Sequence, residues 1–220
     1  MSQLDLEPQD KMPKGAPLAE LLRPQRLGDV VGQDKLIGPD GRLRRMLDQG
    51  ELASIIFWGP PGTGKTTIAR LLADEAGMAF EPVSAVFDGV ADLRKVFARA
   101  ADRLKTGERT LLFVDEVHRF NKAQQDGLLP RVEDGTVTLV GATTENPSFA
   151  LNGALLSRAQ VMVLERLSST ALQALLARVE AHAGHSLPLE ADAREALVAM
   201  ADGDGLSLIH ISEPTRQFRI

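Results

Sequence analysis

The sequence predicts an α/β fold, in which a parallel sheet is flanked by helices and followed by an incomplete small helical lid. Three observations lead to this prediction. Strand-like runs such as "SIIFW", "TLLFVDE" and "TVTLVGATT" alternate with helical patterns, a glycine-rich loop joins the first run to a helix, and strand patterns stop near Ser168. Strands that alternate with helices of this length pair in parallel, so helices must cover both faces of the sheet.

The composition is that of an ordinary globular protein. Of 220 residues, 44% are hydrophobic and 25% are charged, which is enough for one good core. The chain has no cysteine, which excludes a disulfide framework and a thiolate metal site. The net charge of -5 argues against a broad basic surface for duplex DNA. The local basic strip "GRLRRM" could contact DNA, or it could simply be a solvated helix face.

The first residues are expected to lie outside the folded core. Residues 1–17 are polar and include three prolines, which is typical of a mobile leader. They contain no apolar segment that could serve as a signal peptide or a membrane anchor. A cytoplasmic location without a membrane partner is therefore the expectation.

The strongest motif is the loop "GPPGTGKT", from Gly59 to Thr66, which matches the P-loop pattern between a strand and a helix. Glycines let successive backbone N–H groups point at phosphate oxygens, and the helix N-terminus adds its positive end. Lys65 is predicted to contact the β and γ phosphates of ATP, and Thr66 to supply a hydroxyl to Mg²⁺. The alternative is a glycine turn that only links strand to helix. The predicted nucleotide-binding residues here are Gly59, Pro60, Pro61, Gly62, Thr63, Gly64, Lys65, Thr66 and Thr67.

The apolar run "LLFV" leads directly into two adjacent acids, Asp115 and Glu116. Buried carboxylates are costly unless they hold a cation or polarise water, although a strand that runs into an acidic turn would look the same. Together with a P-loop, the pair can divide the work. We predict that Asp115 holds Mg²⁺ through its hydration shell and that Glu116 orients the attacking water.

The run "GATTEN" ends another predicted strand in polar residues. Thr143 or Thr144 could hydrogen-bond the γ-phosphate or the attacking water at this position. A threonine at a strand end is commonplace, so the choice between the two residues, and the role itself, stays open at this level.

Longer stretches around these motifs resemble the AAA+ ATPase core of the replication-associated recombination protein A family, from about Pro17 to Gly205. The most specific of them are "HRFNKAQQD", "VEDG" and "GATTENPSF", joined by "LLSRAQ" and "LAELLRPQRLGDVVGQ". Bacterial clamp-loader subunits and the Holliday-junction motor RuvB are the nearest alternatives. RuvB is similar at "DEVHR" and "GATT", but it is not expected to carry "ENPSF".

The resemblance implies further site residues and partners. Val30, Val31 and Gly32 match a segment that lies against adenine in such ATPases. Ser157 and Arg158 match an element whose arginine reaches the nucleotide of a neighbouring subunit, which requires a homo-oligomer. The family acts at stalled or damaged forks, on DNA ends and single-strand gaps. The implied partners are therefore DNA and single-strand-binding or replisome proteins, with a nucleoid-associated place in the cytoplasm.

The sequence departs from this family after Gly205. The family's lid continues into a helix that begins with arginine, whereas this chain reads "LSLIHISEPTRQFRI". The stretch from Leu206 to Arg216 back-translates to a nucleotide sequence that resembles the transposase-end adapter of sequencing libraries. We expect a leader at 1–17, an ATPase core at 18–167, a partial lid at 168–205 and a non-native tail at 206–220, with a divergent lid helix as the alternative. Such a truncated chain is expected to be impaired as an ATPase and to behave as a nucleotide-binding assembly module.

Overall fold

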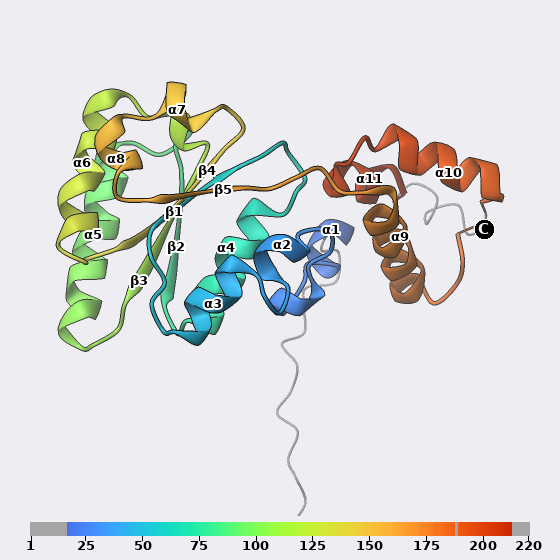
Figure 1. Ribbon diagram of the computed structural model, residues 1–220, viewed down its shortest axis with the longest axis horizontal. Helices are drawn as coiled ribbons and strands as arrows, with labels where there is room; N and C mark the ends of the chain where they lie inside the picture. The colour runs from blue at the N-terminus through green and yellow to red at the C-terminus, as the bar shows by residue number, and fades with distance from the viewer. Residues whose placement is uncertain (1–16, 188, 213–220) are drawn as a thin grey trace, which may run out of the picture.

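The computed structural model describes residues 17–187 and 189–212, and within them five parallel strands form one sheet (Figure 1). The strands are β1 (Ile55–Trp58), β2 (Ala79–Ser84), β3 (Thr110–Asp115), β4 (Thr138–Thr143) and β5 (Gln160–Val163). The helices are α1 (Leu18–Leu21), η1 (Leu27–Asp29), α2 (Asp34–Ile37), α3 (Arg42–Asp48), α4 (Lys65–Glu75), α5 (Val90–Lys105), η2 (Val117–Arg119), α6 (Lys122–Glu133), α7 (Pro147–Ala150), α8 (Gly153–Leu156), α9 (Ser169–Ala183), α10 (Ala191–Met200) and α11 (Gly205–Ser212). The predicted fold class is confirmed.

The strand order β2-β3-β4-β1-β5 places β1 between β4 and β5. Ile56 of β1 is paired with Gly141 on one side and with Val161 on the other. Because all strands are parallel, the loops that follow β1, β3 and β4 emerge at the same edge of the sheet. This edge collects the predicted phosphate loop, the acid pair and the threonines.

Helices cover both faces of the sheet, as Figure 1 shows. Ile55 and Phe57 point to the face that packs against α2, α3 and α4, whereas Ile56 between them joins the cluster with α5, α6 and α8. This alternation follows from the two-residue period of a strand. Since all three side chains are fully buried, β1 is held rigidly where the phosphate loop begins.

Sequence reasoning did not locate two of the strands. β2 carries Glu81 and Pro82, which interrupt its apolar pattern. The structure buries Glu81 by pairing it with Arg99 and Arg103 of α5. β5 is a four-residue edge strand, so only its inward-facing residues need be apolar and buried.

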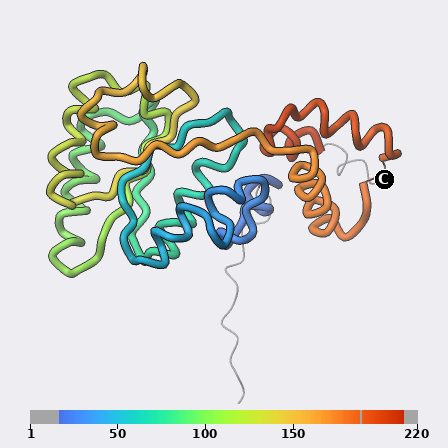
Figure 2. Tube along the Cα trace, in the orientation of Figure 1, coloured from blue at the N-terminus to red at the C-terminus, as the bar shows by residue number. Residues whose placement is uncertain are grey.

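Helices α9, α10 and α11 form a separate small layer with its own apolar cluster, which also contains Leu18 of α1. Figure 2 shows the chain running from β5 into this layer, with α1 beside it. The Ser168 hydroxyl caps α9 by accepting a hydrogen bond from the Ala171 N–H at 3.2 Å. We call α9, α10 and α11 the lid.

Residues 205–212 are helical in the structure, and Leu208 and Ile209 are buried in the lid cluster. The prediction that 206–220 is a non-native tail concerns the origin of this segment and stays a prediction. Residues 213–220 and the predicted leader up to residue 16 lie outside the described residues. Among the helices that are described, none has the length and apolar character needed to cross a membrane.

Candidate functional site

The predicted phosphate loop lies between β1 and α4 and adopts a backbone that favours glycine. Gly62 and Gly64 have φ angles of 68° and 95°, in the left-handed region. Gly64 is also the N-cap of α4, so the first N–H groups of this helix face the loop. A side chain at Gly59 would place its Cβ 2.4 Å from the carbonyl oxygen of Leu164. The arrangement can bind an anion through main-chain donors.

The ammonium group of Lys65 lies inside this loop. It donates hydrogen bonds of 2.8 Å to the carbonyl oxygens of both Gly59 and Pro60. Burial lowers the pKa of Lys65, and the nearby carboxylates of Glu116 and Asp115 oppose that shift. Lys65 is therefore a partly desolvated cation that faces the acid pair.

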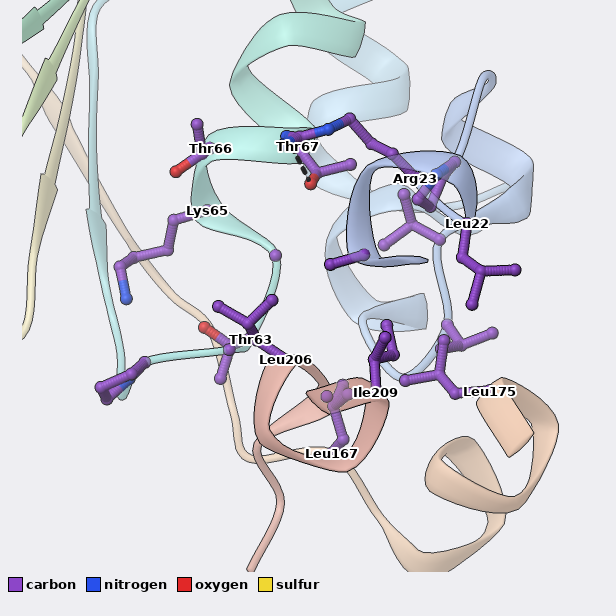
Figure 3. A pocket seen from close by; sticks show the side chains of 18 of the residues that line it. Leu22, Arg23, Thr63, Lys65, Thr66, Thr67, Leu167, Leu175, Leu206 and Ile209 are labelled. Carbon is purple, nitrogen blue, oxygen red and sulfur yellow. Dashed lines mark hydrogen bonds between the residues drawn. The ribbon is translucent and has the colours of Figure 1, made fainter. Parts of the chain in front are cut away.

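A cavity of about 380 Å³ opens between the phosphate loop and the lid (Figure 3). Its polar end is made by the loop, the acid pair and Thr144. Its apolar end contains Leu22, Leu167, Leu175 and Ile209, which Figure 3 shows on the side of α1 and the lid. A cavity with one polar and one apolar end suits a ligand that joins phosphates to a planar base.

The lid contacts the phosphate loop directly. The Gly205 N–H donates to the carbonyl oxygen of Gly62 at 3.2 Å. The carboxylate of Asp204 accepts hydrogen bonds from the N–H groups of Leu206 and Ser207, at 2.8 and 3.0 Å, and so holds the first turn of α11. A Cβ at position 62 would lie 1.7 Å from Asp204 Oδ1. The closeness of loop and lid therefore depends on a glycine at this position.

The acid pair lies at the end of β3 and lines the cavity, as predicted. The Glu116 N–H donates to Asp115 Oδ1 at 3.2 Å. Glu116 has a φ of 51°, and a non-glycine residue in the left-handed region is uncommon. Such conformations persist where the surrounding structure enforces them, frequently at functional sites. Here the conformation lets two successive carboxylates face one cavity.

The structure separates the two predicted threonines. Thr144 lines the cavity and its hydroxyl donates to Glu116 Oε2 at 3.4 Å. Thr143 is fully buried, and its hydroxyl donates to the carbonyl oxygen of Glu145 at 3.1 Å and accepts from the Glu145 N–H at 3.0 Å. Thr144 is therefore placed for the predicted contact with phosphate or water, whereas Thr143 organises the loop behind it.

The predicted Mg²⁺ ligands, Thr66 and Asp115, both line the cavity. Hydroxyl and carboxylate oxygens are hard donors of the kind that Mg²⁺ takes. Within the described residues, no three His, Asp or Glu side chains gather as a complete metal site. The residues present therefore fit an ion that keeps several waters and phosphate oxygens among its ligands, as Mg²⁺ commonly does.

The residues of the segment predicted to contact adenine, 30–32, lie in two different environments. Val30 and Val31 line the cavity. Gly32 does not, and it has a φ of 76° in close contact with the lid, where a Cβ would lie 3.1 Å from Ala171 Cβ of α9 and 2.7 Å from Cδ2 of Leu167, just before the lid. Gly32 therefore allows the lid to approach, and its neighbours face the ligand space.

Arg158 lies away from the cavity of its own chain. It forms an ion pair with Glu133, and its Nη1 donates to the carbonyl oxygen of Ala154 at 2.9 Å. Its side chain is 39% exposed. The structure does not bring Arg158 together with the other predicted site residues, because it does not line their cavity.

Sequence reasoning missed the apolar and cationic residues that α1 and the lid contribute. Arg23, after α1, donates to the Thr67 hydroxyl at 3.5 Å. The only signal in the sequence is the stretch "LAELLRPQ", which contributes to the family resemblance but does not by itself indicate a cavity wall. The missed lining residues are Ala19, Leu22, Arg23, Pro24, Leu167, Leu175, Arg178, Gly205, Leu206 and Ile209.

Several curated proteins are similar to this chain over most of its length. Replication-associated recombination protein A of Escherichia coli K12 is 45% identical over 202 residues, which is 90% of this chain and 45% of that protein. The protein of the same name in Coxiella burnetii is 48% identical over 93% of this chain and 47% of its own length. The ATPase WRNIP1 of Dictyostelium discoideum is 43% identical over 89% of this chain and 23% of its own length. The chain thus spans less than half the length of these relatives, and the resemblance predicted from the sequence is confirmed.

Solved structures of another protein have a similar fold. The Thermotoga maritima RuvB Holliday junction branch migration motor superposes with a TM-score of 0.69 at 29% identity, over 87% of this chain and 64% of that one. A point mutant of the same RuvB gives a TM-score of 0.70 at 28% identity, over 88% and 65% of the two chains.

A protein-family model matches residues 55–167, which are 113 of the 220 residues. The match includes the phosphate loop, the acid pair, both threonines and Arg158. The chain therefore belongs to the ATPase family associated with various cellular activities (AAA).

Proposed function

We propose that this chain binds and hydrolyses ATP as the motor part of a DNA-dependent AAA+ protein that acts at stalled or damaged replication forks. The observation that carries the proposal is one cavity that unites a phosphate loop with Asp115 and Glu116. Membership of an ATPase family supports hydrolysis in general terms. The replication and recombination role draws support from the names of relatives that are 45 to 51% identical.

In the proposed complex, the triphosphate lies along the loop from Gly59 to Thr67 and the base lies at the apolar end, beside Val30 and Val31. Lys65 exchanges its bonds to the two loop carbonyls for bonds to phosphate oxygens, which are better acceptors for an ammonium group. Mg²⁺, when bound, would be held by Thr66 and Asp115 and would neutralise charge on the phosphates.

Glu116 is the proposed residue that orients the attacking water. Its carboxylate lines the cavity and accepts a hydrogen bond from Thr144, which limits the directions it can take. Positioning of the water and stabilisation of charge are the main contributions that protein side chains make to phosphoryl transfer, because the reaction proceeds through a loose transition state.

Arg158 is proposed to act between subunits of a homo-oligomer. Its partial exposure and its distance from its own chain's cavity suit a guanidinium that enters a neighbour's site. In well-studied cases such an arginine contributes about 10³ to 10⁵ in rate. The proposed partners are DNA at single-strand gaps, ends or forks, and single-strand-binding or replisome proteins, within the nucleoid-associated cytoplasm.

Two other functions remain as candidates. The likeness to RuvB suits a branch-migration motor, but that likeness is 28 to 29% in identity, well below that of the recombination protein A relatives. A module that binds ATP and assembles without turnover suits an isolated chain, because Arg158 lies outside its own cavity.

The test is ATP hydrolysis with and without single-stranded or forked DNA, on this chain and on a chain extended to the length of its relatives. We expect the extended chain to hydrolyse ATP faster when gapped or forked DNA is added. Tight ATP binding with no turnover in either chain, with or without DNA, would favour the assembly module. Stimulation by four-way junctions alone would favour branch migration.

A further inference from the structure

His118 lies buried beside the acid pair, and the proposed mechanism above assigns it no task. Its side chain is 3% exposed, and it belongs to η2, which follows Glu116 directly. Its Nδ1 lies 2.9 Å from Thr143 Oγ1 and 3.3 Å from Glu116 Oε2. Its Nε2 lies 3.4 Å from Oε1 of Glu145, whose side chain is 59% exposed. The ring thus joins the end of β3 to the loop after β4.

The hydrogen-bond network assigns a proton to Nδ1. The single hydroxyl proton of Thr143 is directed at the carbonyl oxygen of Glu145, which can only accept. Toward His118, the Thr143 oxygen therefore acts as an acceptor, and so does the carboxylate of Glu116. Both neighbours of Nδ1 are acceptors, so the single Nδ1–H proton, which is present in the neutral and in the protonated ring, is shared between Thr143 Oγ1 at 2.9 Å and Glu116 Oε2 at 3.3 Å.

The position of Glu116 explains why such a donor is needed. Its side chain is 33% exposed, so burial alone does not fix the direction of the carboxylate. Thr144 holds Oε2 from the cavity side at 3.4 Å, and His118 approaches the same oxygen from the buried side at 3.3 Å. Two donors therefore converge on one oxygen of a carboxylate that lines the cavity.

We propose that His118 is a positioning residue that holds the Glu116 carboxylate in its water-orienting geometry through Nδ1–H, with Thr143 fixing the ring. This inference rests on the proposed function of Glu116. It predicts that His118 influences the hydrolysis step and leaves nucleotide binding unchanged, because the ring does not reach the cavity.

The first test needs no enzymatic activity. Long-range ¹H–¹⁵N spectra of the full chain report whether each ring nitrogen carries a proton, and His118→Asn identifies the His118 signals among the four histidines. We expect Nδ1 of His118 to be protonated and to shift in Glu116→Ala, but not in the control Glu108→Ala, whose carboxylate lies on another surface. The proposal would be overturned if Nδ1 of His118 carried no proton, or if its signal did not shift in Glu116→Ala.

The second test compares two substitutions in the extended chain. His118→Leu replaces the ring by an apolar side chain of similar size that has no donor, whereas the amide of His118→Asn can take the place of Nδ1–H. We expect kcat to fall tenfold or more in His118→Leu with an unchanged KM and unchanged binding of a fluorescent ATP analogue. His118→Asn should recover most of the rate, which a purely structural role of the ring would not explain.

Glu116→Gln separates this inference from the function on which it rests. If Glu116→Gln abolishes hydrolysis while His118→Leu retains the wild-type kcat, the role of His118 is wrong and that of Glu116 stands. If Glu116→Gln itself retains the wild-type rate, the proposed function has failed. In a Glu116→Gln background, adding His118→Leu should cause no further loss, because His118 acts through that carboxylate.

Discussion

The N–H of Gly205 donates to the carbonyl oxygen of Gly62 across 3.2 Å, so the lid rests on the phosphate loop through a main-chain hydrogen bond. A side chain at Gly62 would collide with Asp204, which caps the first turn of α11. Any group added at position 62 must therefore displace either the loop or the lid. Since the two together enclose the cavity, a change in the position of the lid changes the space in which we propose that ATP binds.

Gly62→Ala should weaken ATP binding tenfold or more, because the new methyl group separates the lid from the loop. The matched control is Gly77→Ala. Gly77 also has a positive φ, of 61°, but no atom of the described residues lies within 4 Å of an added Cβ. Both substitutions should cost about 1–2 kcal/mol in unfolding free energy from backbone strain. The affinity of each variant is measured by titration with a fluorescent ATP analogue. Equal affinities of Gly62→Ala and Gly77→Ala would contradict this prediction.

Glu81 on β2 should make stability depend on pH. Hydrogen bonds from Arg99 at 2.9 and 2.6 Å, and one from Arg103 at 2.6 Å, lower the pKa of Glu81, although burial opposes the shift. A carboxyl whose folded pKa is depressed stabilises the fold fully above its usual value of 4.5. That contribution is lost as the pH falls through the lower, folded pKa.

Glu81→Gln should therefore lower the melting temperature at pH 7 and make it less dependent on pH below 4.5. We expect a loss of about 1–2 kcal/mol at pH 7, because the amide lacks the charge that attracts both guanidinium groups and has one accepting oxygen in place of two. The control Glu108→Gln removes an exposed carboxylate 3.8 Å from the same Arg103 and should change little. The melting temperatures of both variants and of the unsubstituted chain are measured from pH 7 to pH 3. If the melting temperature of Glu81→Gln depended on pH in the same way as that of the unsubstituted chain, the assigned role of Glu81 would be wrong.

Arg158→Ala, in a chain extended to the length of its relatives, should bind ATP normally but hydrolyse it at least 100-fold more slowly. Mixing this variant with Lys65→Ala should restore part of the activity, because each mixed interface can unite an intact phosphate loop with an intact arginine. Co-assembly is checked by differential tagging. Assembly without any recovery of activity would mean that Arg158 does not act across an interface.

The phosphate loop and the acid pair could be predicted because each is a short local pattern with one structural context. Asp115 and Glu116 follow an uninterrupted apolar run, and Lys65 follows glycines whose backbone angles no other residue adopts easily. The class of the fold was predictable for the same reason, since three of the five strands are uninterrupted apolar runs that alternate with helical patterns.

The remaining parts of the site depend on contacts between distant segments. Leu22 and Leu175 are separated by most of the chain, and nothing in the local sequence around either residue indicates that both face one cavity. The choice between Thr143 and Thr144 depended on which of two adjacent side chains points inward from the end of β4. β2 was obscured by Glu81, whose burial requires arginines from α5.

The central claim is that Lys65 binds the phosphates of ATP and Glu116 acts only in hydrolysis. ATP titration and steady-state hydrolysis of Lys65→Ala and Glu116→Gln, side by side in the extended chain, test it most directly. Lys65→Ala should lose ATP binding, because it removes the cation of the phosphate loop. Glu116→Gln should bind ATP as tightly as the unsubstituted chain and lose at least 100-fold in kcat, because a neutral amide cannot orient water as a carboxylate does. Hydrolysis by Glu116→Gln at the unsubstituted rate would contradict the account.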